Sequence, residues 1–165
     1  MLDKTVSKIA LGGGCHWCTE AVFQSLKGVL KVEQGYVAST GINKEYSEAV
    51  IVHFNSDSIP LAVLIEIHLY THKSTSNHSF RTKYRSAVYY FSEYQATMIS
   101  QILIDLQPLF KEPIITRVLP FTSFKASREC LHNYYLRDPD KPFCKRYIQP
   151  KLKFLKEKFS SRTSV

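Results

Sequence analysis

Three consecutive glycines, Gly12–Gly14, separate an apolar run from a segment of helical periodicity. The apolar run, Val6–Leu11, has the composition and length of a short buried strand. The segment that follows predicts a helix over Trp17–Leu26, which Lys27-Gly28 closes with glycine in the usual position after a helix end. Because glycine tolerates sharp turns and close backbone approach, we expect the strand to turn almost directly into the helix.

The rest of the chain alternates strand and helix signals. Asp57-Ser58-Ile59-Pro60 marks one helix start, with a capping side chain and then proline in the first turn. Ser92-Glu93-Tyr94-Gln95 has the pattern of a capping box and predicts a helix to about Leu106. Strand composition recurs in Val29–Tyr36, Glu48–Phe54, Tyr84–Phe91 and Ile114–Leu119. The order β-α-β-β-α-β, followed by one more helix and strand, predicts an α+β fold, a ferredoxin-like two-layer sandwich.

The positive charge of the chain lies mainly at its C-terminal end. The formal net charge is +8, and residues 141–165 hold eight Lys and Arg against one acid, a net of +7. The apolar residues of this part fall at helical spacing: Ile148, Leu152, Leu155 and Phe159. We expect a single domain, with residues 1–150 as the catalytic body and residues 151–165 as a basic helix or tail docked on it. The alternative is that the tail attracts an acidic partner.

Composition narrows the class of protein. Apolar residues make up 44% of the chain, charged residues 22%, and no apolar run approaches the roughly 18 residues of a membrane span. The first apolar stretch, Ile9-Ala10-Leu11, is too short for a signal peptide, so a cytoplasmic monomer without membrane contact is expected. Because the excess charge lies in the tail and not across the body, a nucleic-acid partner is not expected.

The four cysteines, at positions 15, 18, 130 and 144, carry the main chemical signal. Cys15 lies where the predicted strand turns into the helix, so its sulfur faces free backbone N–H groups and the positive end of the helix dipole, which favour the reactive thiolate. Trp17 offers an apolar wall beside it. Three other interpretations of Cys15 and Cys18 stay open: a buried structural pair, a thioredoxin-like C-x-x-C motif, and a zinc site. Zinc is the weakest, because the later residues Cys130 and Cys144 form no second C-x-x-C.

Five segments, in order, resemble one known family. Gly-Gly-Gly-Cys-His-Trp-Cys-Thr-Glu, around Cys15, is similar to the active-site signature of the A-class peptide methionine sulfoxide reductases, in which a Gly-Cys-Phe-Trp run carries the nucleophile. Thr82–Tyr89 resembles the family's Thr-Gln-Tyr-Arg-Ser-Ala-Ile-Tyr segment. The other segments resemble its first loop and strand, its glutamate-bearing strand and its C-terminal stretch with a resolving cysteine: Gly28–Tyr36, Ser47–Val50 and Glu129–Cys144. The resemblance covers residues 6–150.

The resemblance implies a reaction and the residues that carry it. Cys15 attacks the sulfur of methionine sulfoxide, as the S epimer, in oxidised proteins or peptides. The sulfoxide oxygen gains negative character as the S–O bond weakens, so it needs a proton donor, and Glu48 is implied. Tyr84 is implied as a hydrogen-bond donor to that oxygen, and Trp17 as the wall that holds the substrate's methyl group.

The resemblance also implies how the enzyme is regenerated. The product is methionine plus a sulfenic acid on Cys15, which a second thiol converts to a disulfide. Cys144 is the first candidate for this resolving thiol, on a mobile tail, and Cys18 is the second. An external thioredoxin-like reductant then opens the disulfide by exchange, without a cofactor or metal. Cys130 matches no position of the family and is interpreted as structural.

Three places depart from the family's pattern. His16 replaces its phenylalanine and makes half of the methyl-binding wall polar. The stretch Gly41–Tyr46 is shortened and lacks a second catalytic tyrosine, for which Tyr46 is the nearest substitute. The loop His72–Lys83 is also shortened, and residues 77–80 hold no carboxylate where the family has an aspartate. His16, Trp17 and Tyr46 are therefore the candidate substrate-binding residues.

Two other classes of function remain beside the reductase. A general thiol–disulfide oxidoreductase would use Cys15 and Cys18 and ignore sulfoxides. A non-catalytic module would keep the fold and bind an acidic or nucleic-acid partner through the basic tail. The joint presence of Cys15, Trp17, Glu48 and Tyr84 favours the reductase.

Overall fold

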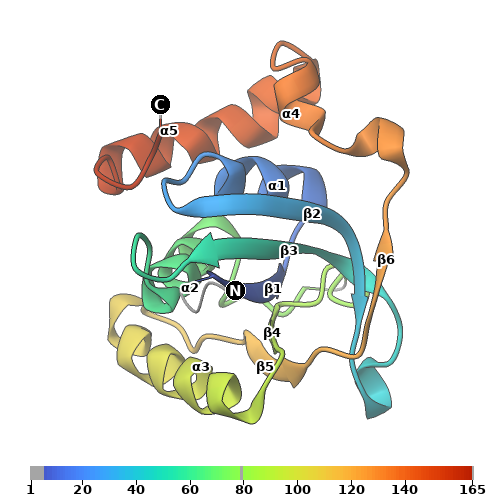
Figure 1. Cartoon of the computed structure of the whole chain (residues 1–165), viewed down its shortest axis with the longest axis vertical. Coiled ribbons are helices and arrows are strands. Elements are labelled where there is room, and N and C mark those ends of the chain that lie inside the picture. Colours follow the sequence, from blue (N-terminus) through green and yellow to red (C-terminus); the bar gives the residue numbers. More distant parts are fainter. Residues whose placement is uncertain (1–5, 79, 165) are drawn as a thin grey trace.

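The computed structural model describes residues 6–78 and 80–164, which contain a six-stranded sheet in the order β5-β4-β1-β3-β2-β6 (Figure 1). The first half of the chain supplies β1 (Val6–Gly12), α1 (His16–Gln24), β2 (Val29–Ala38), β3 (Ser47–Asn55), α2 (Leu61–Thr71) and β4 (Ala87–Tyr90). Strand β1 pairs with β3 and β4, and β3 pairs with β2, all antiparallel. This is the strand order of a ferredoxin-like sandwich, so the predicted α+β fold is confirmed.

The second half of the chain extends the sheet at both edges. It supplies α3 (Glu93–Leu106), β5 (Arg117–Pro120), β6 (Ser123–Ala126), α4 (Tyr134–Arg137), a π-helical turn (Cys144–Ile148) and α5 (Gln149–Lys158). Strand β5 runs parallel to β4, and β6 pairs antiparallel with β2 at the opposite edge. Short 3₁₀ turns lie at Gly41–Asn43, Gln107–Leu109 and Glu129–Leu131. The sequence patterns do not predict β6, which has only four residues.

The main core lies between the sheet and its helices. On β1, Ile9 and Leu11 pack into this core with residues of α1 and α2, whereas Ala10 belongs to a smaller cluster on the opposite face. On β3, Val50 faces the helices and Ile51 the opposite face. This alternation is the two-residue period of a strand. It determines which face of the sheet each side chain of β1 and β3 points to.

Three predicted element boundaries were tested by the structure. The Ser92 side chain accepts a hydrogen bond from the Gln95 N–H at 3.2 Å, so the predicted capping of α3 is confirmed. The predicted side-chain cap before α2 is wrong: Pro60 occupies the cap position and no side chain caps the helix, because the preceding residues form a turn on Asn55. Strand β4 begins at Ala87 and not at Tyr84, because the segment before it forms turns.

The C-terminal helix is packed on the body, as its apolar stripe predicts. Ile148 and Leu155 are fully buried, and Phe159 packs against the main core. The chain end then returns to the end of α1, where the Lys27 N–H donates to the Arg162 carbonyl at 2.7 Å. In the described part of the chain, no helix is long and apolar enough to cross a membrane. Residues 1–5, on which the signal-peptide prediction partly rests, lie outside the described residues.

Candidate active site

The three glycines place Cys15 directly before the first residue of α1. Gly13 has φ of +153°, and a Cβ atom there would lie 2.4 Å from the ring of His72. Only glycine therefore fits where the chain leaves β1 and passes His72. Beyond this turn, the Cys15 carbonyl accepts the N–H groups of Cys18 and Thr19 at 3.1 and 3.2 Å and so begins the helix.

The two cysteines of the C-x-x-C segment differ in protonation. A hydrogen bond from the Cys18 thiol, and then the backbone N–H groups of Trp17 and Cys18, lower the pKa of Cys15 from its ordinary value, although burial and the charge of Glu48 act against this. The same hydrogen bond, together with burial and the charge of Cys15, raises the pKa of Cys18. Of the two thiols, Cys15 is therefore the one that ionises more readily, and the thiolate is the reactive form of cysteine.

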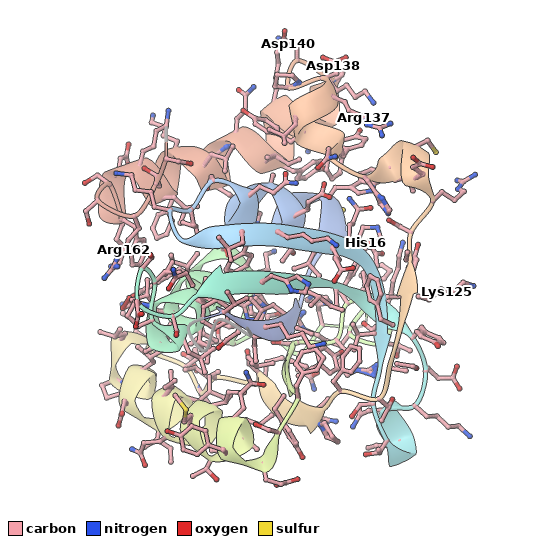
Figure 2. All side chains as sticks on the ribbon, in the orientation of Figure 1. His16, Lys125, Arg137, Asp138, Asp140 and Arg162 are labelled. Carbon is pink, nitrogen blue, oxygen red and sulfur yellow. The ribbon has the colours of Figure 1, made fainter. Side chains whose placement is uncertain are left out.

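Glu48, on β3, lies close to the start of α1. Its Oε1 accepts the backbone N–H of His16 at 3.3 Å and lies 3.4 Å from His16 Nε2, while its Oε2 lies 3.6 Å from Lys83 Nζ. The Glu48 and His16 residues are 6% and 3% exposed. His16, which is labelled in Figure 2, is therefore buried in the interior.

Tyr84 is joined to Glu48 through Lys83. Tyr84 is half-buried, and Lys83 Nζ lies 5.1 Å from the centre of its ring. A hydrogen bond with the Tyr84 hydroxyl, the charge of that hydroxyl when ionised and the charge of Glu48 raise the pKa of Lys83. The sequence patterns assign no role to Lys83, although it stands where the family's segment has glutamine. Two predicted site residues and this lysine thus form one polar group.

Tyr46 points elsewhere. It is 47% exposed, and its hydroxyl lies 3.0 Å from Ser123 Oγ on β6. The structure therefore connects Tyr46 to the edge strand and not to the group formed by Glu48, Lys83 and Tyr84.

Trp17 forms an aromatic cluster with residues of the C-terminal segment. Its ring stacks on that of Tyr134, with centres 4.2 Å apart and 10° between the planes, and meets Phe143 edge-on at 5.2 Å. Tyr134 and Phe143 also meet edge-on, at 5.9 Å. The sequence patterns miss Tyr134, because nothing in the local spacing shows that α4 folds back over the start of α1.

The candidate resolving thiols lie within the body. Cys18 and Cys144 belong to one buried apolar cluster, against which Cys15 packs. All four cysteines are reduced, and burial raises the pKa of Cys144. Cys144 is fully buried in this structure, and its role as the resolving thiol on a mobile segment stays a prediction. Cys130 is exposed on its 3₁₀ turn, and its interpretation as a structural cysteine stays a prediction.

A small cavity of about 50 Å³ adjoins Cys15 and Cys18. Its lining includes His68, His72 and Lys151, none of which the sequence patterns single out. His68 donates from Nε2 to the Gly12 carbonyl at 2.8 Å, and burial lowers its pKa to about 3, so this histidine is neutral. Lys151 reaches the cavity from α5 and donates to the Thr71 carbonyl. Across residues 6–78 and 80–164, no group of three or more His, Cys, Asp or Glu side chains is placed to hold a metal ion.

Comparisons with known proteins point to one family. The family profile described as "Peptide methionine sulfoxide reductase" matches residues 7–163. The peptide methionine sulfoxide reductase MsrA of Thermus thermophilus is 34% identical over 165 residues, which cover 92% of this chain and 94% of the relative. The crystal structure of Mxr1 from Saccharomyces cerevisiae in reduced form has a TM-score of 0.76 at 22% identity, covering 87% of this chain and 92% of Mxr1. Mxr1 in complex with Trx2 has a TM-score of 0.64 at 21% identity, covering 78% and 86%.

Proposed function

The chain belongs to the peptide methionine sulfoxide reductase family, and on this premise we propose that Cys15 is the thiol that takes oxygen from methionine-S-sulfoxide in oxidised proteins and peptides. Membership makes the protein an oxidoreductase that reduces methionine sulfoxide to methionine and so repairs proteins. General disulfide exchange and a non-catalytic binding role are not favoured. The observation that carries the proposal is the lowered pKa of Cys15 at the start of α1, next to the carboxyl group of Glu48.

The proposed first step transfers oxygen from sulfur to sulfur. The Cys15 thiolate attacks the sulfoxide sulfur, and the sulfoxide oxygen takes a proton from Glu48. The attack joins Cys15 Sγ to the substrate sulfur. This transient bond and the S–O bond of the substrate then break as the hydroxyl group passes to Cys15 Sγ, so methionine is reduced and Cys15 is oxidised to a sulfenic acid. Glu48 is left as a carboxylate. Tyr84 supports this step as a hydrogen-bond donor to the oxygen, and Trp17 with Phe143 supplies an apolar wall for the methyl group.

The proposed second step regenerates the thiol. Cys144 attacks the sulfenic sulfur of Cys15, a disulfide forms and the oxygen leaves as water. Support for Cys144 comes from its place in the same buried cluster as Cys18, against which Cys15 packs. Cys18, already hydrogen-bonded to Cys15, is the second candidate. Mass spectrometry after one turnover distinguishes them, since a Cys15–Cys18 disulfide with Cys144 free would reverse the order.

The reductant proposed for the disulfide is a thioredoxin-like dithiol. The similar fold of Mxr1, which has been crystallised in complex with Trx2, supports such a partner. Because the reaction needs only thiols and protons, we propose that the enzyme holds no resident cofactor. Its four reduced cysteines fit a cytoplasmic setting, and we propose that it acts there as a monomer.

The test is turnover of N-blocked methionine sulfoxide, as separate S and R epimers, with dithiothreitol as reductant. We expect the native chain to reduce the S epimer alone and Cys15→Ser to reduce neither. The matched control is Cys130→Ser, which changes an exposed cysteine and should keep full turnover. Turnover that survives in Cys15→Ser would refute the role given to Cys15.

A further inference from the structure

The ring of His16 is anchored on one side. His16 Nδ1 lies 2.8 Å from the carbonyl oxygen of Gly35 on β2. A carbonyl only accepts hydrogen bonds, so Nδ1 carries a hydrogen and donates it. Nε2 is then the nitrogen that gains or loses a proton.

The free side of the same ring faces the carboxyl group of Glu48. Nε2 lies 3.4 Å from Oε1, and the backbone N–H of His16 donates to that same oxygen at 3.3 Å. Oε2 instead faces Lys83 Nζ at 3.6 Å, and the side chain of Lys83 is 64% exposed. One carboxyl oxygen is thus held by His16 in the interior, and the other faces the exposed side chain of Lys83.

We propose that His16 is a positioning residue and proton partner of Glu48: its backbone N–H holds Oε1 and its Nε2 faces the same oxygen at 3.4 Å, so that Glu48 gives its proton to the sulfoxide from Oε2. The proposal rests on the function proposed above, in which Glu48 is the acid. The phenylalanine that the family pattern has at this position offers no ring nitrogen. The contact between a ring nitrogen and Glu48 is therefore a departure of this chain from the pattern. The lysine in place of the pattern's glutamine meets the other oxygen of the same carboxyl group.

The proton balance gives His16 a defined task. When Glu48 releases its proton to the sulfoxide oxygen, a negative charge appears on a carboxyl group that is almost fully buried. The hydrogen bond from the backbone N–H of His16, and the ion pair with the His16 ring when Nε2 carries a proton, stabilise that charge on Oε1. Glu48 then regains its proton on Oε2 from solvent, and the thiols of the external dithiol supply that proton. Oxidation of the dithiol balances the overall reaction, in which the sulfoxide is reduced to methionine and its oxygen becomes water.

The sign of the pH dependence follows from this arrangement. A proton on Nε2 stabilises the charge left on Glu48, so removal of that proton should lower the turnover number kcat. Two other titratable groups act on the pair of His16 and Glu48: Cys15 and Lys83, and Lys83 also contacts Tyr84. The ring of Tyr36 meets the ring of His16 edge-on, with centres 5.1 Å apart. Formation of the Cys15 thiolate acts in the opposite direction, since it raises activity with pH.

The experiment compares His16→Phe, which restores the family's residue, with His16→Gln, which offers a neutral N–H near the position of Nε2. We expect kcat of His16→Phe to fall about tenfold, below the 10²–10⁴-fold typical of a general acid itself, with little change in KM. His16→Gln should recover part of this loss and lack the alkaline fall that Nε2 causes. The control is His53→Gln, because His53 forms a second histidine–glutamate pair, at 2.7 Å from Glu33, in a half-exposed place away from Cys15.

A second measurement does not depend on turnover or on the folding of a buried variant. In protein labelled with ¹⁵N-histidine, His16 should keep the hydrogen on Nδ1 at every pH, while Nε2 titrates. The titration curve of His16 should change in Glu48→Gln, and that of His53 should not. A His16 that carries its only hydrogen on Nε2, or a curve unaffected by Glu48→Gln, would overturn the proposal.

The outcomes separate this proposal from the function on which it rests. Full activity of Glu48→Gln would remove the acid itself and with it the proposed mechanism. Loss of activity in Glu48→Gln, together with unchanged kcat and pH profile in His16→Phe, would leave the mechanism and remove only the role of His16.

Discussion

Cys15 lies between two regions of opposite character. The acid side, formed by His16, Glu48 and Lys83, is polar and joined by contacts of 3.3 to 3.6 Å. The thiol side, formed by Cys18, Cys144 and the aromatic residues around Trp17, is apolar and held mainly by packing. The acid side comes from the first 84 residues, whereas the thiol side joins α1 to the C-terminal segment.

The difference matches the two halves of the reaction. Oxygen transfer needs one proton at one place, which a carboxyl group fixed by hydrogen bonds supplies. Disulfide formation needs two sulfur atoms brought together, and a packed segment allows such movement with few directed bonds to break. Replacing residues of one side should therefore impair one half of the reaction and leave the other.

The largest effect is expected at Glu48. Glu48→Gln should lower the rate of sulfoxide reduction by about 10²-fold or more, because the amide cannot give up a proton to the oxygen. Alkylation of Cys15 by iodoacetamide should persist in this variant. Single-turnover release of methionine gives the measurement, with Glu33→Gln, from the half-exposed pair with His53, as the matched control.

Cys144→Ser should separate the two halves of the reaction. The first equivalent of methionine should form at the normal rate, because the acid side is intact, while steady turnover with thioredoxin should fall by at least about tenfold. A burst of one methionine per enzyme is the expected signal. Equal steady rates for Cys144→Ser and the native chain would show that Cys18 resolves the sulfenic acid alone.

The thiols should also differ in their pH dependence. A lowered pKa keeps Cys15 ionised to lower pH, and a raised pKa keeps Cys144 protonated to higher pH. The alkylation rate of Cys15 should therefore reach half its maximum at a lower pH than that of Cys144. Mass spectrometry of both sites from pH 5 to about 10 follows the two curves. If the alkylation rates of Cys15 and Cys144 depended on pH in the same way, the predicted difference between their pKa values would be wrong.

Tyr134→Ala tests whether packing holds the thiol side closed. Loss of the ring stacked on Trp17 should lower the free energy of unfolding by about 1–2 kcal/mol, since aromatic pairs contribute about 0.5–1.5 kcal/mol beyond area burial. Urea unfolding gives the value, and Tyr94→Ala is the control, because Tyr94 is 78% exposed. Single-turnover reduction should change little, and a large loss there would place Tyr134 in oxygen transfer.

Lys151→Met should have the smallest effect. Its ammonium group lines the cavity next to Cys15 and Cys18 and favours their ionised forms. Without this charge, alkylation of Cys15 at pH 7 should slow by about twofold, which corresponds to a few tenths of a pKa unit. Lys153→Met, an exposed lysine on the same helix, should leave the rate unchanged.

The sequence predicts well what depends on local pattern. The glycine turn before α1, the alternation in β1 and β3, and the Ser92 cap are properties of neighbouring residues, so they can be read from spacing. The side-chain cap predicted before α2 fails because the turn on Asn55 takes the residues that would have formed it. Local pattern cannot distinguish these two outcomes, since both starts have a suitable capping residue.

The parts of the site that the sequence does not reveal depend on direction and distance. The resemblance places His16 at a substrate wall, because it stands where the family pattern has phenylalanine. In the structure its ring donates a hydrogen bond to the carbonyl of Gly35 and is buried. Tyr134 and Lys151 reach the thiols only because the C-terminal segment folds back over α1. Such contacts join residues more than a hundred positions apart, which no periodicity encodes.

The return of the chain end to α1 has a mechanical consequence. On the C-terminal side of Cys144, Ser164 donates its backbone N–H to the Ser25 carbonyl at 2.8 Å, and on its N-terminal side Asn133 donates its backbone N–H to Glu20 Oε2 at 3.1 Å. The segment that carries Cys144 is therefore tethered on both of its sides. If α4 and the π-helical turn lift to admit a reductant, they move as a flap and not as a free arm. A tethered thiol keeps an effective concentration on the order of millimolar near its target, so Cys144 meets Cys15 faster than a dissolved thiol at lower concentration can.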